Sequence, residues 1–468
     1  MALVKPAEVV PLSDLGRVHF AGIGGAGMSG IARLMLARGV PVSGSDSADS
    51  GTLKELEALG ARVHVGHDAA NLGDADTLVV SSAIRDDNPE LALARARGLR
   101  VLHRAGALAS LAQGRRVIAI TGTHGKTTTT SMITTVLLGT GAAPGYVIGG
   151  TLASTGLNAA DEGGRDFVAE ADESDGSFLM LAPNAAVITN IDADHLANYG
   201  TVEAYRASFG AFVDRIVPGG LLVTCADDPG ARVAAGHGRS RGLRVVTYGE
   251  SAAADYQVSD IAVAGLTTSC TVTGPREEQW RLSVGVPGSH YALNGTGCLS
   301  LAIQLGVPAQ DAAAALATYR GAARRMEPKG EAGGVRVLDT YAHHPIELAA
   351  DLAAARQVAG DGRVIAVFQP HLYSRTRIFA AEFGAALGLA DVAVVLDVYA
   401  AREDPEPGVT GELVAGAVPG GVRYLPDVAD VPATIADIAA SGDVVLTMGA
   451  GDVTRLGPLI LAEIAARG

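Results

Sequence analysis

The sequence predicts an α/β protein of three domains. Strand-like runs alternate with amphipathic helical stretches along almost the whole chain, which is typical of parallel sheets with crossover helices. The chain has 468 residues, and at roughly 150 residues per domain this length also gives about three domains. The pattern starts afresh twice. We therefore expect an N-terminal Rossmann-like domain at 1–113, a central P-loop ATPase-type α/β domain at 114–321 and a C-terminal Rossmann-like domain at 322–468.

In the first domain, four short strands are expected to end in Gly, Ser or Asp: RVHFAGIGG, VPVSGSD, ARVHVG and DTLVVSSA. Residues 29–39 and 52–60 lie between them and have apolar residues at helical spacing. The motif GIGGAG, residues 22–27, follows the first strand and precedes a helix. Such glycines allow the backbone to approach a pyrophosphate, although a plain tight turn is the alternative. In a nucleotide or nucleotide-sugar site, Asp46 would lie near a ribose hydroxyl.

The central domain opens with a strand, a glycine loop and a helix in RRVIAITGTHGKTTTTSMITTVLLGTG. Its loop GTHGKT departs from the strict phosphate-loop pattern, because Ile120 stands where the first glycine is expected. Backbone N–H groups of such a loop can cradle phosphates, Lys126 can neutralise their charge, and the hydroxyl of Thr127 can bind Mg²⁺. Further along, residues 252–288 have the character of antiparallel strands with turns.

Two acidic runs follow strands of the central domain. EADESD contains Glu170 and three more acids, and NIDADH ends in His195. A solvated loop is the alternative for each run. Because both follow strands in a domain that holds a phosphate loop, we expect Mg²⁺ ligation by the first and a role close to the metal for His195.

The third domain has four more strands that stop at polar residues: VRVLDTYAHHP, RVIAVFQPH, DVAVVLDVY and DVVLTMGAGD. Before them, Arg324 and Arg325 form either a phosphate clamp or a solvated linker. The paired histidines after the first of these strands lack the spacing of a zinc site. Arg375 and Arg377 could bind a carboxylate, since a guanidinium matches that group in a bidentate manner.

Composition excludes other classes. Hydrophobic residues make up 48% of the chain and charged residues 18%, which excludes disorder as the main state. The formal charge of −14 argues against a general nucleic-acid binder. Three scattered cysteines predict reduced thiols. No signal peptide and no membrane span are expected, so we expect a cytoplasmic protein.

Taken in order, these motifs resemble those of the Mur ligases. The resemblance runs from Gly22 to Asp452 and is carried by AGIGGAGMSGIA, SSAIRDDNPE, TGTHGKTTT, AEADESDGSFL, NIDADHLANY, PGSHYALN, GAARRMEPKGE, DTYAHHPIE, FQPHLYSRT and GAGD. Within the family it is closest to the branch that attaches L-alanine to UDP-N-acetylmuramate. The resemblance implies three domains, for the UDP-sugar, ATP and the amino acid. It also implies ATP-dependent amide formation through an acyl phosphate, with Mg²⁺, in peptidoglycan synthesis, by a monomer or weak homodimer.

Together, the motifs and the resemblance give four sets of site residues. The expected ATP site comprises Gly122, Thr123, His124, Gly125, Lys126, Thr127, Thr128, His290, Asn294, Arg325 and Asp339. The expected UDP-sugar site comprises Gly22, Gly24, Gly25, Ala26, Gly27, Asp46, Ser81 and Ser82. The expected amino-acid site comprises Tyr341, His343, His371 and Arg375, and the expected metal ligands are Thr127, Glu170 and His195. Catalytic roles are expected for Lys126, His195, Arg325 and His343.

The sequence departs from the family pattern at two positions. Phe209 stands where several sister ligases have a carbamylated lysine, and Leu372 stands where some members have an arginine. The nearest alternative is the recycling ligase that attaches a whole murein tripeptide to the same UDP-sugar. A switch protein with a phosphate loop would not explain the C-terminal His and Arg residues, and a dehydrogenase would leave the second phosphate loop unused.

Overall fold

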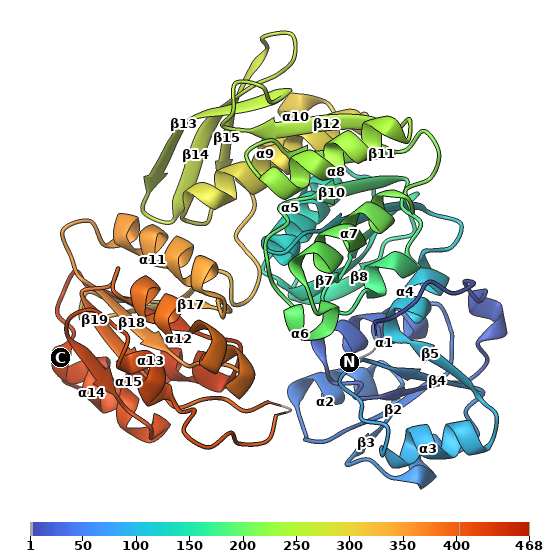
Figure 1. Ribbon diagram of the computed structural model, residues 1–468, viewed down its shortest axis with the longest axis horizontal. Helices are drawn as coiled ribbons and strands as arrows, with labels where there is room; N and C mark the ends of the chain where they lie inside the picture. The colour runs from blue at the N-terminus through green and yellow to red at the C-terminus, as the bar shows by residue number, and fades with distance from the viewer. Residues whose placement is uncertain (1–2, 402, 468) are drawn as a thin grey trace. The chain divides into compact units, whose positions relative to one another are not determined.

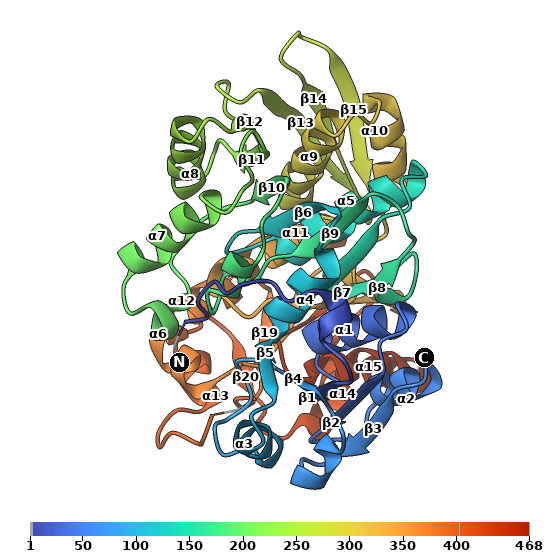
Figure 2. The ribbon, with the colours of Figure 1, turned by 90° about the vertical axis from the view of Figure 1, so that its right-hand side faces the viewer.

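The computed structural model describes residues 3–401 and 403–467 and confirms an α/β fold with three domains (Figures 1 and 2). The described strands form three sheets. By internal contacts the chain divides into two compact units, which are described separately. The first unit holds the residues up to 259 with 272–280 and 293–316, and the second holds 260–271, 281–292 and the residues from 317 onward.

The first sheet has the order β3-β2-β1-β4-β5, and its strands pair in parallel. Its elements are β1 (Val18–Ala21), α1 (Ala26–Ala37), β2 (Val42–Asp46), α2 (Gly51–Ala58), β3 (Arg62–Val65), β4 (Thr77–Val80), α3 (Pro89–Ala96), β5 (Arg100–His103) and α4 (Arg104–Ala112). The direction of strand progression reverses between β1 and β4, and ligands of open α/β sheets bind at such a point. The glycine loop follows β1, and Ser81 follows β4, so the predicted UDP-sugar residues gather at this point.

The central sheet has the order β15-β14-β13-β12-β11-β10-β6-β9-β7-β8. Its first elements are β6 (Arg116–Thr121), α5 (Lys126–Gly139), β7 (Gly145–Leu152), β8 (Leu157–Asp161), β9 (Asp166–Glu170), β10 (Ala185–Ile188), α6 (Leu196–Tyr199), α7 (Val202–Val213), β11 (Leu221–Cys225), α8 (Pro229–Ser240) and β12 (Arg244–Gly249). Strand β6 is buried from Val117 to Thr121 and pairs in parallel with β9 on one side and β10 on the other. The phosphate loop and both acidic runs therefore leave the sheet at the carboxyl ends of three adjacent strands.

The segment expected to be antiparallel forms β13 (Tyr256–Ala264), β14 (Thr267–Thr273) and β15 (Gln279–Val284). These strands are neighbours in the sheet, and only two residues join β13 to β14. So short a connection can join only antiparallel strands. The segment continues the central sheet, because β12 and β13 pair in parallel at Tyr248 and Tyr256. Helices α9 (Ser289–Gln304) and α10 (Ala309–Ala317) follow.

The third sheet has the order β16-β17-β21-β18-β19-β20. Its elements are β16 (Glu327–Ala332), β17 (Val335–Thr340), α11 (Pro345–Ala359), β18 (Val364–Phe368), α12 (Tyr373–Leu387), β19 (Val392–Val395), α13 (Gly411–Ala415), β20 (Val422–Tyr424), α14 (Val431–Ile438), β21 (Val444–Met448) and α15 (Leu456–Arg467). β16 is antiparallel to β17, and the other pairs are parallel. Ile435 of α14 and Ile460 of α15 pack on Val337 and Val445 of the sheet, forming the core of this domain.

Short 3₁₀ helices span Leu12–Asp14, Ala69–Leu72, Ser177–Met180, Val428–Asp430 and Asp452–Arg455. Cys225, Cys270 and Cys298 are buried thiols. Among the residues that the structure describes, no helix is both long enough and apolar enough to cross a membrane.

Candidate active site

The phosphate loop joins β6 to α5 through two glycines with left-handed backbones. Gly122 has φ of 136° and Gly125 has φ of 82°. A Cβ atom on Gly122 would lie 2.0 Å from Oγ1 of Thr189, and one on Gly125 would lie 3.2 Å from Oδ1 of Asn294. Both the backbone angle and the lack of space therefore require glycine at position 122. The predicted residue Asn294 lies directly against the loop.

The residues after β10 fix the shape of this loop. The N–H of His124 donates to Oδ1 of Asn190 at 2.9 Å, and the hydroxyl of Thr189 donates to the carbonyl of His124 at 2.6 Å. The N–H of Thr123 donates to the carbonyl of Asn190 at 3.0 Å. Neither Thr189 nor Asn190 was among the predicted site residues. The available signal was their position, at the end of the strand next to β6.

Lys126 begins α5, and its ammonium is surrounded by acceptors. Nζ donates to the carbonyls of Gly122 at 2.8 Å and Thr123 at 3.0 Å, and it lies 2.9 Å from Oε2 of Glu173. Burial by itself would lower the pKa of Lys126, but the nearby carboxylates, Glu173 foremost, raise it above its usual value. The ammonium is therefore charged. Glu173, fully buried, belongs to the acidic run that was expected to bind Mg²⁺, but its pairing with Lys126 was not predicted.

Glu170 and Thr127 form a pair of oxygen ligands beside the loop. The hydroxyl of Thr127 donates to Oε1 of Glu170 at 3.0 Å, and the N–H of Gly149 donates to Oε2 at 2.7 Å. Hydroxyl and carboxylate oxygens are the ligands that Mg²⁺ prefers. The chemistry of this pair fits the metal expected from the sequence.

His195 lies in a different group of side chains. It has a left-handed backbone with φ of 54°, and its Nε2 lies 3.5 Å from Oε1 of Glu173 and 3.4 Å from Oδ2 of Asp194. Burial lowers its pKa, but these two carboxylates outweigh burial and raise it. Within residues 3–401 and 403–467, no three His, Cys, Asp or Glu side chains are grouped so as to hold a metal. Metal ligation by His195 stays a prediction.

The glycine loop of the first domain is organised by Asp46. The N–H of Gly24 donates to Oδ2 of Asp46 at 2.9 Å, and the N–H groups of Gly22 and Ile23 donate to the carbonyl of Ser45. Asp46 thus contacts the loop itself, and its expected contact with a ribose stays a prediction. Helix α1 begins after Gly25 with no side-chain cap and no acidic residue in its first turn. Such an uncapped N-terminus favours an anion.

Ser82 was expected at the UDP-sugar, but in this structure its hydroxyl donates to Asp175 and lies 3.1 Å from Nε2 of His103. It therefore links the first domain to the first acidic run of the central domain. Its proposed contact with the sugar diphosphate requires this hydrogen bond to be exchanged.

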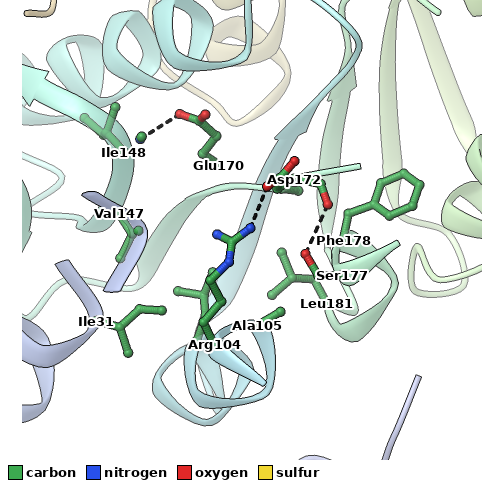
Figure 3. Close-up of a pocket in the computed structure, with 14 residues that line it drawn as sticks. Ile31, Arg104, Ala105, Val147, Ile148, Glu170, Asp172, Ser177, Phe178 and Leu181 are labelled. Carbon is green, nitrogen blue, oxygen red and sulfur yellow. Dashed lines mark hydrogen bonds and ion pairs between the residues drawn. The ribbon is translucent and has the colours of Figure 1, made fainter. Parts of the chain in front are cut away.

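A cavity of about 150 Å³ lies between the first and central domains (Figure 3). Its wall includes Gly27 from the glycine loop and Glu170 from the phosphate-loop site. Arg104, the first residue of α4, extends into it, and its Nη2 lies 2.5 Å from Oδ2 of Asp172. Arg104 was not predicted, because nothing in its local sequence indicates that α4 brings it beside a different domain.

In the second unit, the structure brings the predicted amino-acid residues together at the carboxyl ends of β17 and β18. The ring of Tyr341 lies 5.3 Å from that of His343, which lies 6.2 Å from that of His371. The guanidinium carbon of Arg325 lies 5.4 Å from the centre of the Tyr341 ring. Arg375 is close enough for its charge to act on His343. We call these five residues the C-terminal pocket.

His343 is a neutral base in this pocket. Burial lowers its pKa to about 3, and the charge of Arg375 acts in the same direction, although Glu347 opposes both. Its Nδ1 lies 2.9 Å from the carbonyl of Tyr341, which can only accept a hydrogen bond. Nδ1 therefore carries the proton, and Nε2 keeps its lone pair.

The remaining predicted residues of the second unit are engaged within the protein. Asp339 is fully buried and accepts hydrogen bonds from the hydroxyls of Thr447 at 2.6 Å and Thr454 at 2.7 Å. Its expected contact with the ATP ribose stays a prediction. Burial, aided by the charge of Arg325, lowers the pKa of His290 to about 4. Arg377 is half-exposed and pairs with Glu406 at 2.9 Å.

In a comparison with known proteins, three successive segments of the chain match models of the same family. Family models described as "Mur ligase family, catalytic domain", "Mur ligase middle domain" and "Mur ligase, glutamate ligase domain" match residues 17–116, 120–302 and 324–451. Among similar proteins, the UDP-N-acetylmuramate–L-alanine ligase of Thermobifida fusca is 57% identical, covering 99% of this chain and 100% of that protein. The ligase of the same name from Kineococcus radiotolerans is 56% identical, covering 98% of this chain and 99% of that protein.

Solved structures agree. The UDP-N-acetylmuramate-alanine ligase of Thermotoga maritima superposes with a TM-score of 0.84 at 28% identity, covering 97% of this chain and 100% of that chain. A murein peptide ligase from Psychrobacter arcticus superposes with a TM-score of 0.72 at 24% identity, covering 96% of this chain and 99% of that chain, and shows the same fold.

Proposed function

The chain belongs to the Mur ligase family, and from this premise we propose that it joins L-alanine to the lactyl carboxylate of UDP-N-acetylmuramate at the expense of ATP. Its strong similarity to ligases of that name along its full length supports this substrate pair. The observation that carries the proposal is the cavity whose wall includes both the glycine loop and Glu170 of the phosphate-loop site. A sugar nucleotide held at one end would present its carboxylate to ATP at the other.

The reaction needs an activated carboxylate, because an amide does not form from a free carboxylate in water. ATP transfers its γ-phosphoryl group to the carboxylate, which gives an acyl phosphate and ADP. Lys126 and the loop of residues 122–128 hold the phosphates of ATP, and Arg325 contacts the transferred group. Thr127 and Glu170 would hold Mg²⁺, and we propose His195, which lies against Glu173 and Asp194, as a further metal ligand. Bound Mg²⁺ neutralises phosphate charge, and catalysis of this kind is mainly positioning and charge neutralisation.

The second half-reaction is assigned to the C-terminal pocket. Arg375 binds the carboxylate of L-alanine, and Tyr341 and His371 surround the amino acid. His343 accepts a hydrogen bond from the ammonium at Nε2, which carries no proton, and so orients the amino group. A pKa of about 3 makes His343 too weak a base to keep the proton, which the ammonium releases to solvent. The neutral amine then attacks the acyl carbon, and phosphate leaves.

Further assignments complete the proposal. The UDP-sugar diphosphate lies at residues 22–27 with Ser81 and Ser82, and His290 and Asn294 lie toward the adenine of ATP. We place the domain boundaries at 113/114 and 321/322. We also propose a cytoplasmic enzyme of peptidoglycan precursor synthesis, acting as a monomer or weak homodimer, because it uses ATP and a UDP-linked precursor.

The test is phosphate release from Mg²⁺-ATP and UDP-N-acetylmuramate with different amino substrates. We expect release with L-alanine, and little with L-Ala-γ-D-Glu-diaminopimelate. Release with the tripeptide alone would instead identify the recycling ligase. Phosphate release that does not depend on the UDP-sugar would contradict ligation altogether.

A further inference from the structure

Arg104 stands between the two ends of the cavity described above. Of the described residues that line the cavity, it is the one cation, opposite the carboxylates of Glu170 and Asp172. Figure 3 shows its side chain rising from α4 toward Asp172, with Ile31 and Val147 to one side and Phe178 and Leu181 to the other. The cavity thus has apolar walls, two carboxylates and one guanidinium, and the guanidinium is the group there that suits the anionic end of an organic molecule.

On one side, Arg104 faces the N-terminal end of helix α1, which carries a partial positive charge. Its Nη1 would lie only 2.9 Å from a Cβ atom on Gly27, so the guanidinium lies against the first turn of α1. That turn has no acidic residue and no side-chain cap. A cation beside the positive end of a helix is unfavourable unless an anion lies close to both. Asp172 supplies that anion here, and Asp175 lies farther away, at 4.0 Å from the same Nη2.

The carboxylate of Asp172 shows how Arg104 holds such a group. It lies 2.5 Å from Nη2, and the two side chains are 23% and 30% exposed. If another carboxylate takes its place at Arg104, Asp172 keeps the hydrogen bond that its Oδ1 accepts from the N–H of Ser174 at 3.0 Å. Glu170, which holds the Mg²⁺ in our proposal, lines the same cavity. A carboxylate bound to Arg104 would therefore lie between the sugar site and the phosphate loop.

We propose that Arg104 binds the lactyl carboxylate of the UDP-sugar in exchange for Asp172 and so positions it for phosphorylation. This proposal rests on the function proposed above. It makes Arg104 a substrate-binding residue that selects the acidic sugar, in addition to the residues that hold the diphosphate. A guanidinium suits this task because its two N–H groups match the two oxygens of a carboxylate.

The competing explanation is that Arg104 only ties α4 to the central domain. A matched control exists, because Arg38 also comes from the first domain and binds Asp161 of the central domain through Nε at 2.8 Å and Nη2 at 2.7 Å. Arg38 does not line the cavity. Arg38→Gln therefore removes an ion pair of the same kind and leaves the cavity intact.

The experiment measures binding of two ligands by calorimetry. UDP-N-acetylmuramate has the carboxylate, and UDP-N-acetylglucosamine has the same diphosphate without it. We expect Arg104→Gln to weaken binding of the first by ~10–100-fold, the range for a lost charged hydrogen bond, and binding of the second by less than ~3-fold. Arg104→Lys keeps the positive charge but loses the paired N–H groups of the guanidinium, so its affinity for UDP-N-acetylmuramate should lie between those of the unmodified protein and Arg104→Gln. Arg38→Gln should change the affinity for either ligand by no more than ~3-fold.

Equal weakening of both ligands by Arg104→Gln would overturn the proposal and place the guanidinium at the diphosphate or in the domain contact. An unchanged affinity for UDP-N-acetylmuramate would overturn it as well. The proposed function is checked separately, through the L-alanine-dependent phosphate release of the unmodified protein. If that release is absent, the proposed function fails, whatever the binding ratio of the variants.

Discussion

The phosphate-loop site and the C-terminal pocket carry opposite excess charge. At the loop, one cation, Lys126, faces several carboxylates, including Glu170 and Glu173. In the pocket, Arg325 and Arg375 are accompanied by His343, which burial keeps neutral. The loop therefore needs further cations before it can bind the negatively charged phosphates of ATP. The pocket already has the positive charge that an anionic ligand needs.

The two sites also differ in which part of the chain forms them. The loop relies on backbone N–H groups and on glycines that no other residue can replace, such as Gly122. The pocket relies on side chains at strand ends, such as Tyr341 and His371. Backbone recognition suits phosphate, which is the same in every nucleotide. Side chains suit an amino acid, because they can be varied to choose among sister substrates.

The largest effect should come from the single cation of the loop. Lys126→Ala should lower kcat by ~1,000-fold or more, because phosphoryl transfer depends on charge neutralisation. Binding of UDP-N-acetylmuramate, measured by calorimetry, should stay within ~3-fold. The control is Lys54→Ala, since Lys54 lies on the surface and pairs with Asp49 at 3.2 Å. Near-normal turnover of Lys126→Ala would contradict the assignment of the loop as the phosphate site.

The pocket should respond in KM for one substrate. Arg375→Ala should raise KM for L-alanine by ~30–100-fold and KM for ATP by less than ~3-fold, because a lost charged hydrogen bond is worth about 2–3 kcal/mol. Arg377→Ala is the control, since its partner is Glu406. Equal changes in both KM values would show that Arg375 maintains the domain rather than binding the amino acid.

Removal of one carboxylate charge at the loop should change the Mg²⁺ requirement. Glu170→Gln should raise the Mg²⁺ concentration for half-maximal activity by ~10-fold, because an amide oxygen is a weaker ligand than a carboxylate. Glu347→Gln, in contact with His343 of the pocket, should leave that concentration unchanged. An equal rise in the required Mg²⁺ concentration for both variants would show that the two sites do not differ in their need for cations.

The smallest effect concerns stability. Burial raises the pKa of Asp351 to about 7, although Thr340 donates a hydrogen bond to it at 2.5 Å. Between about pH 4 and pH 7 the unfolded chain loses this proton while the folded protein keeps it, so stability from this group falls as the pH rises. Asp351→Asn should therefore gain about 3 kcal/mol of stability relative to the unmodified protein between pH 4.5 and pH 8. Urea unfolding at both pH values measures this, and a constant difference would contradict it.

The local sequence was enough to predict the strands and helices and the loops that join them. The glycines at residues 22–27 and 122–125 predicted both strand–loop–helix units, because their spacing reflects a backbone requirement. The carboxyl ends of β17 and β18 were likewise predictable from the polar residues that stop each buried run.

Contacts between separate segments could not be predicted in this way. Thr189 and Asn190 shape a loop that lies some 65 residues earlier in the chain. Glu173, three residues beyond Glu170, is the carboxylate that binds Lys126. Arg104 enters the cavity because α4 lies beside the central domain. In each case, the partner is set by the packing of strands and domains, which a motif does not record.

The three cysteines have a practical consequence. Cys225, Cys270 and Cys298 are all buried, and burial raises the pKa of Cys225 to about 11 and that of Cys298 still further. Thiolate is the reactive form, so the folded protein should resist alkylation and oxidation. One sulfur lies in β11, one in β14 and one in α9. The alkylation rate of each thiol would report how often its own segment opens. The three natural cysteines would thus serve as probes of local unfolding in three segments, without any engineered label.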